Sequence, residues 1–249
     1  MKKSLIYILS FLLVSNVFSA PKETGWEKDG LKGKVKESIC TEYAIKNKLG
    51  EQVKVITGKT ITAYNAEGNQ TEATTYDANG KFLVKFILKY DAKGNNIEWV
   101  SNSAEGTYNC KITYTYDDNG NMIDSTSYWG ADQTLKSIYK HDPKGNLIER
   151  SNYGNTGSLL SKTVSKYDNF SREAETEEYD DHGLKRKLLY KYDNGKLIEI
   201  IETEPNGDLI SKMVFKYDDK GNRLESETFN ADKALTGASK FSYIYYPND

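Results

Sequence analysis

The sequence predicts an all-β protein of tandem antiparallel β-hairpins, and three observations predict it. A Tyr-Asp phrase such as KYDDKGNRLE at 216–225 recurs every 25 or 26 residues, and a fixed period of this size marks a repeat architecture. A second group of turn residues, such as YDANG at 76–80, falls between the copies. The segments between turns alternate apolar and polar side chains, which is the period of a strand. One repeat is therefore a β-hairpin of about 26 residues.

The first segment of the chain predicts export. Lys2 and Lys3 precede an apolar run from Leu5 to Val14, and small residues follow at Ser19 and Ala20. The run is too short to span a bilayer comfortably. We therefore expect a signal peptide at 1–19 and an exported protein, in the periplasm, at the cell surface or released. No Cys lies at the cleavage region, which argues against a lipoprotein anchor, and no transmembrane segment is expected after signal removal.

Two further segments complete the predicted organisation. Residues 20–32 are expected to be a flexible lead-in, and residues 33–249 a single repeat domain. Within it, 35–46 and 53–64 look like a longer, degenerate first hairpin, and FSYIYY at 241–246 looks like a last strand that ends at Pro247. Some sixteen short strands result, and open sheets rarely pass about ten strands without curling or splitting. The expected sheet is a long, twisted or curled meander, either open or closed on itself.

The main turn has a physical reason for each of its letters. Asp or Asn at the start of a turn accepts hydrogen bonds from backbone N–H groups two residues on, and Gly takes the positive φ that other residues resist. The first position of the phrase is Tyr64, Tyr90, Tyr116, His141, Tyr167, Tyr192 and Tyr217; the second is Asn65, Asp91, Asp117, Asp142, Asp168, Asp193 and Asp218; Gly follows at Gly68, Gly94, Gly120, Gly145, Gly195 and Gly221.

The strand before each main turn predicts one apolar face. Phe86, Leu88 and Tyr90 share this face. With a four-residue loop, Leu88 is expected to face Ile97 and Phe86 to face Trp99.

The opposite face is expected to carry alternating charges. A Lys stands five residues before each Tyr position, as at Lys85, and an acid follows each main turn, as at Glu98. In the same hairpin Ile87 is expected to face Glu98, with Lys85 and Lys89 as diagonal neighbours. Such surface pairs contribute about 0.2–1 kcal/mol each, and alternating charge also fixes register and keeps a strand-rich protein from aggregating. A solvated face is the preferred interpretation over a charged binding strip.

The two cysteines are expected to remain unpaired. Cys40 and Cys110 fall on strands about five spacings of ~4.8 Å apart if the strands follow one another across the sheet. A disulfide needs Cα atoms within ~7 Å. Only a sheet that brings its ends together would change this expectation.

The phrases YDAKGNNIE, YDDNGNMID and YDDKGNRLE resemble the YD repeats of the bacterial Rhs family. The resemblance covers nearly the whole mature chain, which looks most like the small exported YD-repeat proteins. The chain is too short to enclose a toxin domain as the large relatives do, it has no non-repeat C-terminal domain, and its period is longer than the commonest form. The resemblance implies a β-hairpin repeat fold, and some YD-repeat proteins are described as carbohydrate-binding.

Motifs for chemistry are missing from the sequence. It has no G-x-S-x-G elbow, no Cys/His zinc spacing and no Gly-rich nucleotide loop. His141 occupies a repeat Tyr position and His182 a turn. EEYDD at 177–181 and YDDNGN at 116–121 fit a strand end and a turn better than a glycosidase pair or a calcium loop. No catalytic, cofactor or metal site is therefore expected, and a formal charge of about −4 for the mature chain argues against nucleic acid.

The preferred functional hypothesis is a non-enzymatic binding or structural module of the cell envelope. Its expected partner is a glycan or an envelope protein. Trp129 and Tyr128, at a second turn, are the candidate ligand surface, because aromatic side chains stack on sugar rings; core packing or loop anchoring is the preferred interpretation of these side chains. Two alternatives remain open: a hydrolase with carboxylates in an unseen cleft, and a surface adhesin that varies in repeat number.

Overall fold

The structure, a computed structural model, describes residues 24–104, 110–129 and 133–247. The signal peptide predicted at 1–19 lies outside these residues. One short helix, α2 (Gly25–Lys28), precedes sixteen strands. Their bounds are β1 Val35–Lys48, β2 Glu51–Tyr64, β3 Gln70–Asp77, β4 Phe82–Tyr90, β5 Asn96–Ser103, β6 Cys110–Tyr116, β7 Met122–Trp129, β8 Gln133–His141, β9 Leu147–Tyr153, β10 Leu159–Tyr167, β11 Glu173–Asp180, β12 Gly183–Asp193, β13 Lys196–Thr203, β14 Leu209–Tyr217, β15 Arg223–Asn230 and β16 Leu235–Tyr245.

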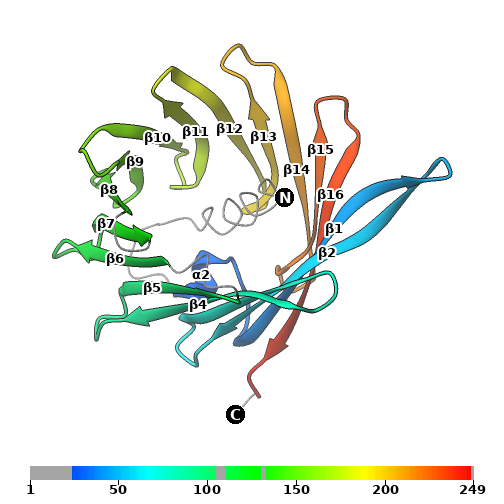
Figure 1. Cartoon of the computed structure of the whole chain (residues 1–249), viewed down its shortest axis with the longest axis horizontal. Coiled ribbons are helices and arrows are strands. Elements are labelled where there is room, and N and C mark those ends of the chain that lie inside the picture. Colours follow the sequence, from blue (N-terminus) through cyan, green and yellow to red (C-terminus); the bar gives the residue numbers. More distant parts are fainter. Residues whose placement is uncertain (1–23, 105–109, 130–132, 248–249) are drawn as a thin grey trace.

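The strands form one antiparallel meander that closes into a barrel (Figure 1). Each strand pairs with the next along the chain, and β1 pairs with β16 from Val35↔Tyr245 to Ala44↔Gly237. The predicted all-β hairpin meander is thus confirmed. Of the two forms that the sequence left open, an open curl and a closed barrel, the structure has the closed barrel. Among the described helices, none is long and apolar enough to cross a membrane.

The main turns are built as the sequence predicted. In the turn after β4, Oδ1 of Asp91 accepts a hydrogen bond from the Asn95 backbone N–H at 2.8 Å, and Oδ2 accepts one from the Asn95 side chain at 2.9 Å. The Gly94 N–H bonds back to the Asp91 carbonyl at 2.9 Å, with φ +72° at Gly94. The Asp-to-backbone bond recurs at Asp117, Asp142, Asp168 and Asp218.

The turn between β12 and β13 is tighter than the other main turns. Asp193 pairs directly with Lys196, so only Asn194 and Gly195 form the loop, and both have positive φ. An Asn-Gly pair in this conformation is the favoured two-residue hairpin turn.

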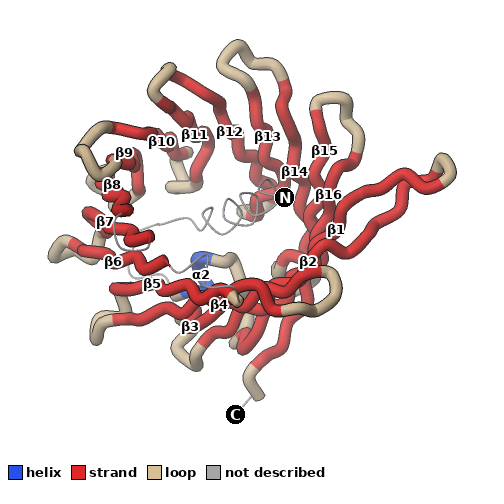
Figure 2. Tube along the Cα trace, in the orientation of Figure 1, coloured by secondary structure: helices blue, strands red, loops and turns tan. Residues whose placement is uncertain are grey.

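The two faces of the sheet can be assigned from α2. This helix lies inside the ring of strands (Figures 1 and 2), and its Trp26 packs against a buried cluster of Leu31, Val35 and Tyr64. We call the face that bears Tyr64 the inner face. Its neighbour Ala63 points the other way, so the opposite face, which also bears Glu72 and Lys89 by register, is the outer face.

The pairing register between β4 and β5 differs from the expectation by two residues. Leu88 faces Trp99, Phe86 faces Ser101 and Lys89 faces Glu98, so the expected Leu88–Ile97, Phe86–Trp99 and Ile87–Glu98 pairs are wrong. Two features account for the change: the loop between Tyr90 and Asn96 has five residues, not four, and a β-bulge between Lys89 and Tyr90 adds one more residue beside the turn. The assignment of residues to faces survives, since a shift of two keeps the alternation.

The lead-in is packed where it was expected to be flexible. Thr24 and Glu27 form a capping box on α2. The Trp26 indole N–H donates to the Val35 carbonyl at 2.6 Å, and the Tyr64 hydroxyl donates to Asp29 at 2.5 Å. These contacts hold residues 24–32 of the lead-in against the inner face, at the end of the barrel where the main turns lie.

The two cysteines lie on β1 and β6, in agreement with their predicted separation, and both thiols are free. Burial raises the pKa of the Cys40 thiol to about 12 and that of the Cys110 thiol to about 11.

Candidate functional site

One sector of the inner face is aromatic and aliphatic. Phe86 and Trp99 stack with ring centroids 4.7 Å apart and an interplanar angle of 19°. Register extends this surface across β4 to β8, and we call it the aromatic wall. It comprises Phe86, Leu88, Trp99, Cys110, Ile112, Tyr114, Trp129, Leu135 and Tyr139.

The neighbouring sector of the inner face is largely polar, although Leu188, Tyr190 and Ile200 also lie on it, and we call it the polar wall. Arg186 donates to Glu178 and to Glu202, both at 2.7 Å, and Ser211 also donates to Glu202 at 2.7 Å. The Arg150 Nε is buried without a hydrogen-bond partner in the part of the chain that the structure describes. The wall runs over β9 to β13 and comprises Arg150, Asn152, Ser161, Thr163, Ser165, Thr176, Glu178, Arg186 and Glu202.

The two predicted ligand-surface residues lie on opposite faces of β7. Trp129 pairs with Cys110 on the inner face, whereas Tyr128 pairs with Lys111 on the outer face and is 42% exposed. At the rim, Trp129 lines an open hollow of about 420 Å³ with Thr134, Leu135, Gly154 and Asn155. Trp129 therefore lines a hollow at the rim and Tyr128 lies on the outer face, and their role as a ligand surface stays a prediction.

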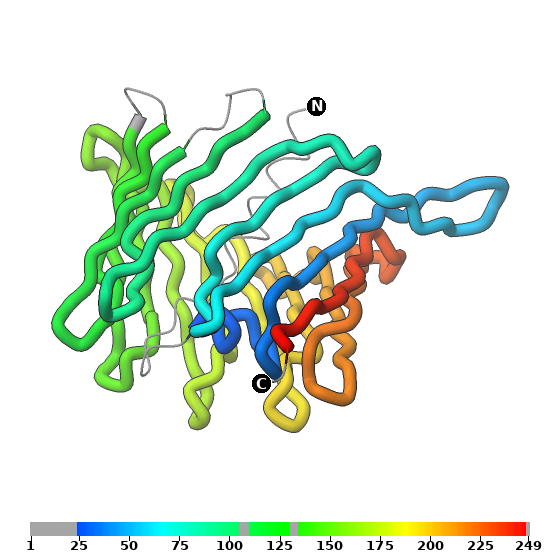
Figure 3. Tube along the Cα trace, turned by 90° about the horizontal axis from the view of Figure 1, so that it is seen from below, coloured from blue at the N-terminus to red at the C-terminus, as the bar shows by residue number. Residues whose placement is uncertain are grey.

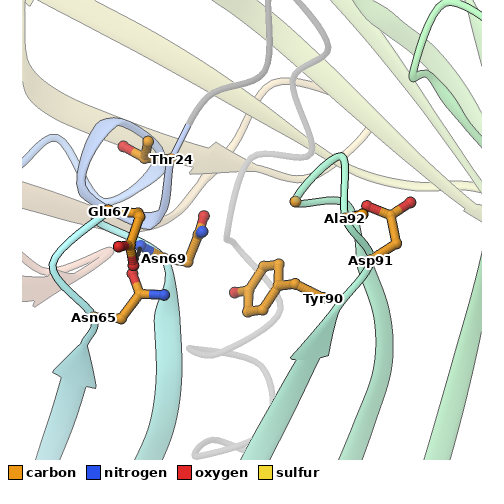
Figure 4. A pocket seen from close by; sticks show the side chains of 8 residues that line it. Thr24, Asn65, Glu67, Asn69, Tyr90, Asp91 and Ala92 are labelled. Atoms are coloured by element: carbon orange, nitrogen blue, oxygen red, sulfur yellow. Dashed lines mark hydrogen bonds between the residues drawn. The ribbon is translucent and has the colours of Figure 1, made fainter.

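A second hollow, of about 410 Å³, lies at the other rim between the first two main turns. In Figure 4 the Tyr90 ring extends toward Asn65 and Asn69, while Asp91 points away into its own turn. The Tyr90 hydroxyl is already engaged, since it donates to the Gln70 carbonyl at 2.7 Å. Thr24 of the lead-in completes the lining, so this hollow depends on a segment that sequence analysis treated as flexible.

The outer face carries a ladder of ion pairs. Glu98 contacts Lys89 at 2.5 Å and Lys111 at 2.6 Å, and these two contacts lower the pKa of the Glu98 carboxyl. The pattern confirms the predicted charge alternation, although the pairing partners differ. Further pairs are Lys85–Glu72, Lys140–Glu149, Lys166–Glu175, Lys187–Glu177, Lys191–Glu199, Lys212–Glu199, Lys216–Glu225 and Lys240–Glu225.

The other residues weighed for chemistry do not converge. Glu177 binds Lys187 on the outer face, while its neighbour Glu178 binds Arg186 on the inner face, so they form no carboxylate pair. His141 takes the structural position of the repeat Tyr, and burial lowers its pKa. His182 is exposed in the turn after β11. The described residues hold no cluster of three His, Cys, Asp or Glu side chains suited to a metal.

Sequence reasoning missed Trp26 and Asp29 as anchors. Burial raises the pKa of the Asp29 carboxyl, opposed by the hydrogen bond from Tyr64 and by the nearby charge of Arg223. A Trp in a segment that is otherwise Gly- and charge-rich, GWEKDG, was the available signal.

Comparison with known proteins relates the fold to solved barrels. No family model matches the chain, and no curated protein matches it. The chain is similar to a porin-like protein from Bacteroides uniformis, with a TM-score of 0.60, 12% identity, and coverage of 86% of this chain and 99% of that one. A porin-like protein from Bacteroides vulgatus has a TM-score of 0.36 and 16% identity, and the match covers 86% of this chain and 99% of that one. A TcdB2-TccC3-Cdc42 structure has a TM-score of 0.33 and 11% identity, and the match covers 83% of this chain but 16% of that one. At these identities the likeness concerns the barrel fold.

Proposed function

We propose that the protein is an exported, non-enzymatic binding module of the cell envelope, and that it binds glycans on the inner face of its barrel. One observation carries the proposal: the distribution of side chains between the two faces. The outer face carries a ladder of ion pairs, with exposed apolar side chains such as Ile87 and Ile138 among them, whereas the inner face combines an aromatic wall with a polar wall.

The outer face argues for a barrel that stands in water. A barrel that spans a bilayer presents an outward apolar band about 25 Å tall, and a Lys at the midplane costs about 2–4 kcal/mol there. Here Lys and Glu recur along the outward positions of the strands, from Lys85–Glu72 to Lys240–Glu225. The wall of this barrel is therefore proposed to face solvent, in contrast to a membrane pore.

The inner face has the chemistry that a sugar needs. Barrels of sixteen strands enclose more space than their side chains fill. Aromatic rings offer flat apolar surfaces to the C–H faces of a sugar, and the neighbouring polar wall offers carboxylate, amide, hydroxyl and guanidinium groups to its hydroxyls. The hollow beside Trp129 places an aromatic ring next to Asn155 at the entrance. A glycan chain entering the barrel would meet this rim first.

The test uses neighbouring residues on the two faces. Purified chain from residue 20 is applied to a broad glycan array, with Trp129→Ala as the test variant and Tyr128→Ala as the matched control. We expect selective glycan binding that weakens about tenfold in Trp129→Ala, since aromatic contacts contribute on the order of 1 kcal/mol beyond area burial. Tyr128→Ala should bind as the unmodified chain does.

Two results would contradict the proposal. Failure of the unmodified chain to bind any glycan removes the carbohydrate function. Loss of binding in Tyr128→Ala with binding retained in Trp129→Ala would place the ligand on the outer face and reject the inner-face site.

A further inference from the structure

The first hairpin extends beyond the barrel. β1 and β2 each have 14 residues, against 7–11 in the other strands. β1 stops pairing with β16 at Ala44, and β2 stops pairing with β3 at Gly58. Among the described strands, residues 45–57 pair only within the β1–β2 hairpin. We call residues 45–57 the arm; Figures 1 and 3 show it projecting past the ring.

The tip of the arm carries an apolar residue, Leu49, in a backbone conformation that Leu disfavours. Lys48 pairs with Glu51, so Leu49 and Gly50 form a two-residue loop, with φ +53° and +89°. This turn type favours Asn-Gly, because a branched side chain resists positive φ. Leu49 is also fully exposed, at 106%. A Leu at this position serves neither the turn nor the core, which points to a contact outside the molecule.

The charge around the tip is opposite to that of the whole chain. The segment AIKNKLGEQVKVI at 44–56 holds three Lys and one Glu, in a chain of net charge −2. Lys46 and Lys48, both exposed, directly precede the tip, while Lys54 binds Glu227 at 3.1 Å. An apolar side chain at the end of a projecting arm, next to cationic side chains, matches the boundary between lipid headgroups and acyl chains.

We propose that the arm docks the protein on an anionic membrane surface. Leu49 inserts into the headgroup region, and Lys46 and Lys48 contact lipid phosphates. A membrane is favoured over a pocket on a partner protein because the tip offers one apolar side chain and adjacent positive charge, which a flat anionic surface accepts without shape complementarity. The inference rests on the proposed envelope location and assigns a surface outside the proposed glycan site.

Co-sedimentation with lipid vesicles tests the docking. The chain from residue 20 is mixed with vesicles of phosphatidylglycerol and phosphatidylethanolamine, or of phosphatidylcholine alone. We expect binding to the anionic vesicles only, with release in high salt. Leu49→Asn should weaken it at least about tenfold, since burying a Leu side chain is worth a factor of this order. Because Asn suits the turn better than Leu, thermal unfolding of this variant should occur at the same or a higher temperature.

Phe170 provides the matched control. It is 79% exposed at the tip of a main turn, at the opposite end of the barrel, and Arg172 stacks on its ring at 4.9 Å. Phe170→Asn should leave vesicle binding unchanged. The proposal is overturned if the unmodified chain ignores anionic vesicles, which would leave a protein pocket as the occupant of the arm, or if Leu49→Asn binds them as tightly as the unmodified chain. Equal weakening by both variants also overturns it. Glycan-array binding by Leu49→Asn, expected to be unchanged, separates this outcome from failure of the glycan proposal.

Discussion

Most repeats are stabilised by two side chains, the Asp of the main turn and the Tyr that precedes it. The Asp of the main turn caps backbone N–H groups, and the Tyr before it reaches the carbonyl of a residue on the preceding strand. The Tyr116 hydroxyl, for example, donates to the Asn96 carbonyl at 2.6 Å. The same bond recurs from Tyr90, Tyr167, Tyr217 and Tyr243. The turn role of Asp was predictable from sequence because it is local. The Tyr bond was not, since it crosses strands whose register depends on a bulge.

His141 breaks this pattern and supplies a first prediction. Its Nε2 is buried without a hydrogen-bond partner among the described residues, and the imidazole lacks the reach of a phenol. His141→Tyr should restore the bond to the Met122 carbonyl, the acceptor that corresponds by register. We expect a gain of about 1 kcal/mol, or roughly 2–4 °C in Tm for a chain of this size, measured by calorimetry. Tyr116→His should cause a loss; a Tm unchanged in both variants would remove the Tyr bond as a source of stability.

At the scale of elements, the strands and their faces were predictable and the lead-in was not. The alternation of apolar and polar residues predicted which side chains from Phe86 to Lys89 share a face of the sheet. The Asp and Gly of the repeated phrase predicted the positions of the turns. The lead-in at 20–32 has no repeat signal, because its order comes from contacts with distant residues. Trp26 rests on Gly68, and Lys32 is held by Asn222. Trp129 was predicted as a candidate ligand contact. The other residues of the aromatic wall could not be predicted, because they are brought beside it by the pairing register of β4 to β8.

The contact between the lead-in and the first main turn supplies a second prediction. A Cβ at Gly68 would lie 2.5 Å from the Trp26 ring, whereas a Cβ at Gly80 would meet nothing within 4 Å. Both glycines have similar φ, +85° and +80°. Gly80→Ala should therefore cost only the backbone strain, about 1–2 kcal/mol. Gly68→Ala should cost more and shift Trp fluorescence, because Trp26 must move. Urea unfolding measures both; equal costs would show that Trp26 does not stabilise the barrel.

At the scale of the whole molecule, the barrel closes where the repeat ends. The sequence left an open curl and a closed barrel undecided, because closure depends on strand tilt and stagger around all sixteen strands. The start of β1 and the residue before it close the barrel: the Tyr246 N–H donates to the Lys34 carbonyl at 2.8 Å, and Val35 pairs with Tyr245. The resemblance to YD repeats stays a prediction, since the likeness to solved structures concerns the barrel fold.

The final prediction concerns the contribution of Asn222 to closure of the barrel. This residue is fully buried at the last main turn. Its side chain accepts from the Lys32 N–H at 2.5 Å and donates to the Lys32 carbonyl and the Tyr245 hydroxyl at 3.1 and 3.0 Å. Asn222→Ala leaves these backbone groups without a partner, at a cost of about 1–3 kcal/mol. Hydrogen exchange should then quicken at the seam between β1 and β16. Asn121→Ala, at the equivalent position of a turn far from the seam, should leave seam protection intact. Seam protection unaffected by Asn222→Ala would show that strand pairing alone, without the lead-in, holds the barrel closed.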